Sequence, residues 1–197
     1  MIIIGERINS TRKTVAPAVE AKDVAFIQKE AQAQAAGGAH YLDVNVATMM
    51  EQECDRMEWA IRAIQEVVDL PICIDTPNPE AMKVGLATAK GKSIMSSITG
   101  EKKRLEAYVP LLKDHDCSVV ALCMDDTGMP ETGEQRFAIG AKLVAEILKT
   151  GKKEEEIFLD PLVRPVSTGS HYGTVVLETI SRLKAEFPGV HVVCGLT

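Results

Sequence analysis

The stretch LPICIDTPN (residues 70–78) combines a short apolar run with an abrupt carboxylate. Residues 72–74 are typical of a strand in a parallel sheet that is covered on both faces. Pro77 and Pro79 prevent the strand from continuing, and Pro79 suits the first turn of a helix. Asp75 therefore either lines a ligand site at the carboxyl end of the strand or caps the helix that follows.

Apolar runs followed by amphipathic stretches recur along the whole chain. The pattern predicts strands at 2–4, 41–46, 72–74, 92–98, 118–124, 157–163 and 190–197, and helices at 23–36, 54–68, 79–89, 101–115, 133–150 and 171–187. Such alternation implies right-handed crossovers and a parallel sheet. Seven strand-helix units suit a (β/α)8 TIM barrel better than a five-stranded open sheet, because barrels of eight units average about 250 residues.

We therefore expect one domain over residues 1–197, an α/β barrel that covers about seven βα units and lacks the last helix-strand-helix. An unclosed barrel would leave the backbone edges of its first and last strands unpaired. We expect the barrel to close either with a partner or with residues beyond Thr197. The second explanation is favoured, with roughly 50 to 70 residues lacking at the C-terminus.

The composition excludes several classes of protein. The chain is 46% hydrophobic and 25% charged, and its net charge of −6 comes without a basic stripe, so neither nucleic acid nor an anionic membrane is an expected partner. The apolar N-terminus is interrupted by Glu6 and Arg7, too early for a signal peptide or a membrane span, which predicts a cytoplasmic protein. The five cysteines are scattered, and no metal site is expected.

Polar residues gather where the predicted strands end. They are Glu6, Asn9, Asp43, Asn45, Asp75, Ser96, Ser97, Asp125, Asp126, Asp160 and Thr197. In such barrels the carboxyl ends of the strands form the active site, although about half of these residues are expected only to cap helices. Carboxylates on separate strands suit a planar ligand that presents paired N–H donors, such as a pterin, a purine or an amidine.

Four motifs in sequence order resemble those of a known family. They are IIGERIN (3–9), GAHYLDVNV (38–46), CIDTPN (73–78) and FLDPLV (158–163), and the chain ends in GLT (195–197). The chain resembles the pterin-binding methyltransferases, and most closely the methyltetrahydrofolate:corrinoid protein methyltransferases, which include components of anaerobic O-demethylases. The resemblance runs along the whole chain.

The resemblance implies a (β/α)8 barrel, usually a homodimer, that binds tetrahydrofolate and docks a separate corrinoid protein carrying cobalamin. It implies pterin-binding roles for Asp75 and Asp160, and for Ser96 where the family commonly has asparagine. Asn9, Asp43, Asn45, Ser97 and Thr197 are secondary candidates, and Ser97 or a bridging water could compensate for the shorter reach of Ser96. The family's catalytic asparagine would lie just after Thr197.

The implied reaction moves a methyl group between N5 of tetrahydrofolate and the cobalt of the corrinoid protein, in a direction that the residues leave undetermined. A dihydropteroate-synthase-like pterin enzyme is one alternative, although that family should show a different first strand from Glu6-Arg-Ile-Asn9. A non-catalytic folate-binding subunit is the other alternative.

Overall fold

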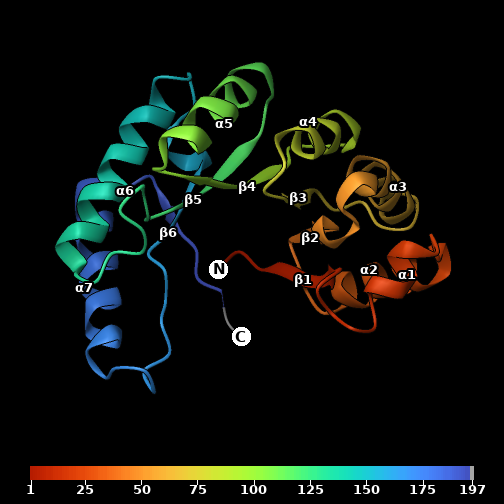
Figure 1. The fold of residues 1–197 in the computed structure, drawn as a ribbon, viewed down its shortest axis with the longest axis horizontal. Coiled ribbons are helices and arrows are strands. Elements are labelled where there is room, and N and C mark those ends of the chain that lie inside the picture. The colour runs from red at the N-terminus through yellow and green to blue at the C-terminus, as the bar shows by residue number, and fades with distance from the viewer. Residues whose placement is uncertain (196–197) are drawn as a thin grey trace. The chain divides into compact units, whose positions relative to one another are not determined.

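The computed structural model describes residues 1–195, and it divides into two compact units, of which the first is Met1–Ser96 and the second begins at Ser97 (Figure 1). Each unit combines parallel strands with helices that follow them in the chain. The α/β character predicted from the alternating pattern is therefore confirmed.

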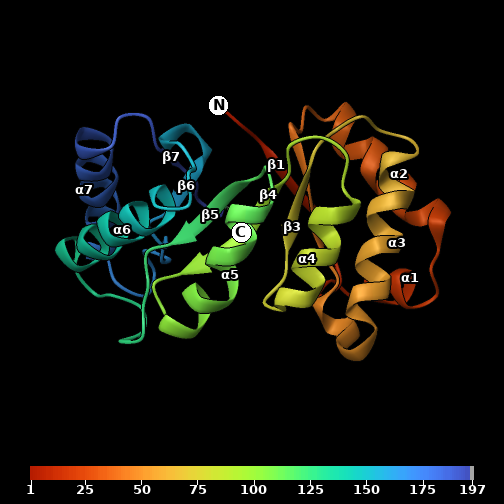
Figure 2. The same cartoon turned by 90° about the horizontal axis from the view of Figure 1, so that it is seen from above.

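The first unit contains the strands β1 (Ile4–Asn9), β2 (Tyr41–Asn45) and β3 (Ile72–Asp75) and the start of β4 (Ile94–Thr99). Neighbouring strands in this unit pair in chain order and run parallel. Its helices are α1 (Ala16–Glu20), α2 (Val24–Ala36), η1 (Ala47–Gln52), α3 (Glu53–Gln65) and α4 (Pro79–Thr88). Helices α2, α3 and α4 stand side by side along the strands (Figure 2).

Burial explains the composition of the strands in this unit. In β3, Ile72 and Ile74 are fully buried and Cys73 is 2% exposed, as expected for a strand that is covered on both faces. Helix α2 begins where its sequence offers a cap, since Asp23 accepts a hydrogen bond from the Phe26 amide. This regular packing leaves the polar side chains at the strand ends in defined positions.

The second unit contains β5 (Ser118–Leu122), β6 (Ile157–Asp160) and β7 (His191–Val192), which again pair in parallel and in chain order. Its helices are α5 (Lys102–Asp114), α6 (Gly133–Leu148), η2 (Glu154–Glu156) and α7 (His171–Glu186). Helix α6 begins with a capping box, in which Thr132 accepts from the Gln135 amide while the Gln135 side chain accepts from the Thr132 amide.

The structure differs from the predicted elements at both ends of the chain. The first strand begins at Ile4 and continues to Asn9, instead of ending at residue 4, because its residues pair with β2 as far as Asn45. Glu6 therefore lies within the strand and not after it. In the part of the last predicted strand that the structure describes, residues 190–195, only His191 and Val192 have ladder partners, Phe158 and Leu159 of β6. The short helix α1 and both 3₁₀ helices were not predicted.

Candidate functional site

Asp75, the last residue of β3, is held by a side chain from the neighbouring strand. Asn45, the last residue of β2, donates from Nδ2 to Asp75 Oδ2 at 2.7 Å. Its amide orientation is fixed because Asn45 Oδ1 accepts from the Ala47 backbone N–H at 3.2 Å. On the other side Asp75 pairs in register with Ser96 of β4. Three of the predicted site residues therefore lie together at the carboxyl ends of adjacent strands.

A buried acid lies two residues before this end of the sheet, on β2. Asp43 is 5% exposed and stands in register with Cys73, whose thiol is hydrogen-bonded to the Asp43 carboxyl and to Ser96. Burial raises the pKa of Asp43 well above its usual range, and the nearby charges of Asp75 and Glu6 act in the same direction. Burial likewise raises the pKa of Cys73, so the thiol stays protonated.

The loop after Asp75 is fixed by a buried carboxylate from the start of α3. Glu53, 4% exposed, accepts from the Thr76 hydroxyl and from Asn78 Nδ2, the latter at 3.0 Å. Asn78 caps α4, because its side chain accepts from the Glu80 amide at 3.0 Å. The role of helix cap, which was the alternative for Asp75, is thus filled by Asn78.

Asp160, the last residue of β6, occupies the corresponding position in the second unit. Its Oδ1 accepts from the Leu162 amide at 2.7 Å, which leaves Oδ2 with no hydrogen bond among residues 1–195. Burial raises the pKa of Asp160, while the Leu162 N–H and the charge of Arg136 oppose that rise. Asp160 can therefore still accept hydrogen bonds from a ligand.

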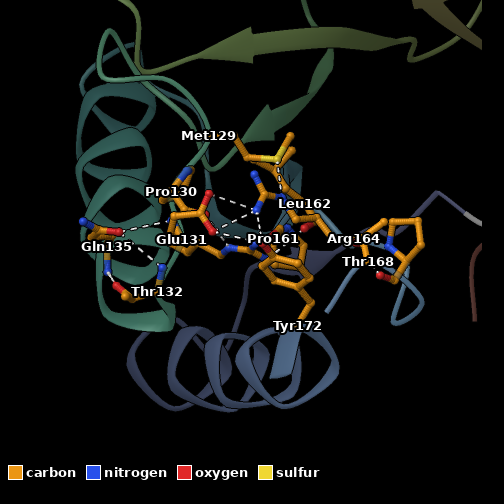
Figure 3. A network of polar contacts seen from close by, with 12 residues as sticks. Met129, Pro130, Glu131, Thr132, Gln135, Pro161, Leu162, Arg164, Thr168 and Tyr172 are labelled. Atoms are coloured by element: carbon orange, nitrogen blue, oxygen red, sulfur yellow. Dashed lines mark hydrogen bonds and ion pairs between the residues drawn. The ribbon is translucent and has the colours of Figure 1, made fainter. Parts of the chain in front are cut away.

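Two further side chains organise the loops of the second unit. Arg136 on α6 donates to the carbonyl oxygens of Pro130, Pro161 and Leu162. Arg164 donates to Glu131 and to the Tyr172 hydroxyl (Figure 3). Both arginines connect the loop before α6 to the loop after β6.

Glu53 and Arg136 are absent from the residues predicted to form the site, although the sequence carries a signal for Arg136. Arg136 falls on the apolar face of α6 together with Ile139, Gly140 and Leu143, all of which are buried. A charged residue at such a helical position indicates a buried polar contact. Glu53 lacks a comparable signal because it precedes the apolar pattern of α3.

Several other predicted candidates have local structural roles. Asn9 accepts from Thr11, and Asp125 accepts from Thr127, each within its own turn. Asp126 accepts from the Lys102 amide at the start of α5, as expected for the fraction of strand-end residues that cap helices. Thr197 lies outside the described residues.

The arrangement is suited to hydrogen bonding. Among residues 1–195 there is no group of three or more His, Cys, Asp or Glu side chains that could hold a metal ion. Within the same range no helix has the length and apolar character needed to cross a membrane. What the strand ends offer are carboxylate oxygens whose orientation is set by amide and backbone donors, which suits a ligand rich in N–H groups.

Comparison with known proteins agrees with this chemistry. The family model described as "Pterin binding enzyme" matches residues 5–197. The methylcorrinoid:tetrahydrofolate methyltransferase of Eubacterium limosum is 35% identical over 199 residues, which are 100% of this chain and 73% of that protein. The methionine synthase of Mycobacterium leprae is 27% identical over 208 residues, again 100% of this chain but 17% of the length of that protein.

Solved structures support the fold. The 7,8-dihydropteroate synthase of Vibrio fischeri ES114 has a TM-score of 0.74 at 17% identity, covering 99% of this chain and 73% of that one. The dihydropteroate synthase of Xanthomonas albilineans has a TM-score of 0.56 at 21% identity, covering 99% of this chain and 72% of that one. Because the family model spans nearly the whole chain and a curated relative shares 35% identity, the resemblance seen in the motifs is confirmed, and the chain belongs to the pterin-binding enzymes.

Proposed function

We propose that the protein transfers a methyl group between N5 of tetrahydrofolate and the cobalt of a corrinoid protein. The observation that carries this proposal is the oriented carboxylate at the end of β3, where Asn45 holds Asp75 at 2.7 Å. The similarity to the E. limosum methyltransferase extends over the whole chain and supports the same reaction. We also propose that the chain contributes most of a (β/α)8 barrel and that the protein acts as a homodimer in the cytoplasm.

In this proposal the pterin is recognised by groups from three strands. Asp75 and Asp160 accept hydrogen bonds from the N–H groups along the pterin edge, because a carboxylate accepts two donors side by side. Ser96 takes the place where the family commonly has asparagine. Side chains alternate along β4, so Ser96 shares the face of its strand partner Asp75, whereas Ser97 points to the opposite face. The proposal therefore gives the third contact to Ser96.

For methyl transfer the protein must position the folate and supply a proton or a hydrogen bond to the methyl-bearing nitrogen. A methyl group on a tertiary amine leaves poorly unless the nitrogen gains a proton or a strong hydrogen bond as the bond breaks. The corrinoid of the partner protein supplies the metal that exchanges the methyl group. Burial raises the pKa of Asp43 beside Asp75, and Asp43 together with Asn45 would keep the polar end of the sheet in one arrangement.

The reaction itself can be followed by absorption spectroscopy. Mixing the full-length enzyme with tetrahydrofolate and methylcobalamin, or with methyltetrahydrofolate and reduced cobalamin, should change the cobalt spectrum and would also compare the two directions. No change in either mixture, even with a corrinoid protein present, would contradict the proposal. Folate binding without transfer would instead identify a non-catalytic folate-binding subunit.

The pterin contacts can be tested by calorimetric titration with methyltetrahydrofolate. Asp75→Asn and Asp160→Asn should each weaken binding by about 1.5 to 3 kcal/mol, because each removes a hydrogen bond to a charged group. Asp23→Asn in the first unit and Asp126→Asn in the second make the same chemical change at helix starts, and they should leave the affinity unchanged. Wild-type affinity in both site variants would show that these carboxylates have only structural roles.

A further inference from the structure

Arg136 is the largest fully buried side chain among the described residues, at 0% exposure. It projects from the first turn of α6, on the face that carries Ile139, Gly140 and Leu143 into the interior. A guanidinium group is rarely buried to this extent unless it is paired. The surroundings of Arg136 therefore need an explanation beyond packing.

The guanidinium group is bound entirely by backbone oxygens. Nη1 donates to the carbonyls of Pro161 and Leu162, each at 2.8 Å, and Nε donates to the carbonyl of Pro130 at 3.3 Å. Pro161 and Leu162 are the two residues that directly follow Asp160, whereas Pro130 lies just before α6 (Figure 3). Arg136 thus joins the loop after β6 to the start of α6.

The segment that Arg136 binds also determines the orientation of Asp160. The Leu162 amide donates to Asp160 Oδ1 at 2.7 Å, and Leu162 adopts a φ of +61°, in the left-handed region that leucine rarely occupies. A leucine stays in this conformation only where its surroundings hold it there. The two 2.8 Å bonds from Arg136 to the carbonyls of residues 161 and 162 supply such a constraint.

Stability alone does not account for this arginine. It has no ion pair within residues 1–195, its Nη2 has no hydrogen-bond partner there, and burial together with the nearby Arg164 lowers its pKa. A buried charge with an unsatisfied donor is costly, and an apolar side chain of similar volume is often neutral or stabilising in such a place. Departures of this kind from good packing are expected at functional sites.

We propose that Arg136 is a positioning residue that fixes the Asp160 carboxylate for ligand binding by holding residues 161 and 162 in their turn. The inference rests on the proposed function, because it takes Asp160 to contact the pterin. Arg136 should hold residues 161 and 162 in their turn whether or not a ligand is bound. Arg136 acts only through the backbone and does not touch the ligand.

The loop can be tested without folate. Arg136→Lys keeps the charge but cannot span three carbonyls, so hydrogen exchange at the Leu162 amide should quicken on the order of tenfold, as when about 1.4 kcal/mol of local stability is lost. Arg182→Lys is the matched control, since Arg182 is exposed and packs on Phe137 of the same helix α6. It should leave the Leu162 amide unchanged. Unchanged exchange in Arg136→Lys would overturn the proposal.

Coupling to Asp160 is then measured by a double-mutant cycle on folate affinity. Arg136→Lys should weaken binding roughly tenfold in the wild-type background and should have almost no effect in Asp160→Asn, because it acts through that carboxylate. Equal losses in both backgrounds would overturn the positioning role and indicate a general structural one. If Asp160→Asn alone leaves the affinity unchanged, the pterin contact of the proposed function fails, and the exchange result still decides whether Arg136 holds the loop. Arg136→Met serves for the same measurements if the lysine variant does not fold.

Discussion

Strands β3 and β6 end alike, in an aspartate followed by a loop with proline, but the two loops are held by opposite charges. After β3, the buried Glu53 accepts from the side chains of Thr76 and Asn78. After β6, the buried Arg136 donates to the backbone carbonyls of Pro161 and Leu162. The contacts of Glu53 therefore depend on the identity of the side chains in the first loop, whereas the contacts of Arg136 depend only on the backbone path of the second loop.

The two loops should differ in how well they tolerate substitution. Replacing Thr76 or Asn78 removes a partner of Glu53 and leaves a buried carboxylate with fewer hydrogen bonds. Replacing Val163 or Ser167, which are exposed in the loop after β6, leaves every contact of Arg136 in place. We therefore expect the loop after Asp75 to tolerate fewer substitutions than the loop after Asp160.

The largest effect is expected when the acid of the first loop is removed. Glu53→Ala should lower the free energy of unfolding by about 3 kcal/mol, because two hydrogen bonds to a charged group are lost and their partners are left inside the protein. Urea denaturation measures the change. Glu58→Ala on the same helix is the control, since Glu58 forms an exposed ion pair with Arg62 and should cost less than about 0.5 kcal/mol. Equal stability of the two variants would show that Glu53 does not hold the loop after β3.

A smaller effect is expected at two helix caps, that of α4, which follows the first loop, and that of α6, the helix that carries Arg136. Asn78→Ala removes both the cap of α4 and a partner of Glu53, and should cost about 2 kcal/mol, whereas Thr132→Ala removes only the cap of α6 and should cost about 1 kcal/mol. Combining Asn78→Ala with Glu53→Ala should cost less than the sum of the two single changes. Strict additivity would show that Asn78 and Glu53 act independently.

The sequence predicts an element when a local pattern of residues determines it, and fails when pairing with a distant residue determines it. Strands such as β3 and β5 were predicted because an apolar run with a proline or a carboxylate at its end has few other interpretations. The beginning of β1 at Ile4 could not be predicted, because it is set by register with Tyr41 of β2, a residue far along the chain. The short helix α1 is below the length at which periodicity is visible.

The candidate site divides in a similar way. Asp43 and Asn45 were predicted from strand alternation and Asp75 from its position at a strand end, and the structure brings them together with Ser96. The family was recognised from the order of four motifs, and that recognition is confirmed. Glu53 and Arg136 were missed because a buried charge is identified by its partners, and those partners are a loop hydroxyl, a loop amide and backbone carbonyls that no motif encodes.

The smallest expected effect concerns Asp43, the buried acid near Asp75. Its raised pKa should make the free energy of unfolding depend on pH. Because the pKa of Asp43 is raised in the folded protein, the folded state keeps a proton that the unfolded state releases above about pH 3.9. Stability contributed by this proton is complete below that pH, and it falls as the pH rises towards the raised pKa of the folded state. Asp75, Glu6 and Cys73 are the titratable groups that face Asp43.

Asp43→Asn removes this dependence, since an amide of the same shape has no proton to lose. The difference in unfolding free energy between Asp43→Asn and wild type should therefore increasingly favour the variant as the pH is raised through that window. Urea denaturation at a series of pH values measures the difference, with Asp23→Asn as a control on the surface of the same unit. A difference that stays constant with pH would mean that the pKa of Asp43 is not raised in the folded protein.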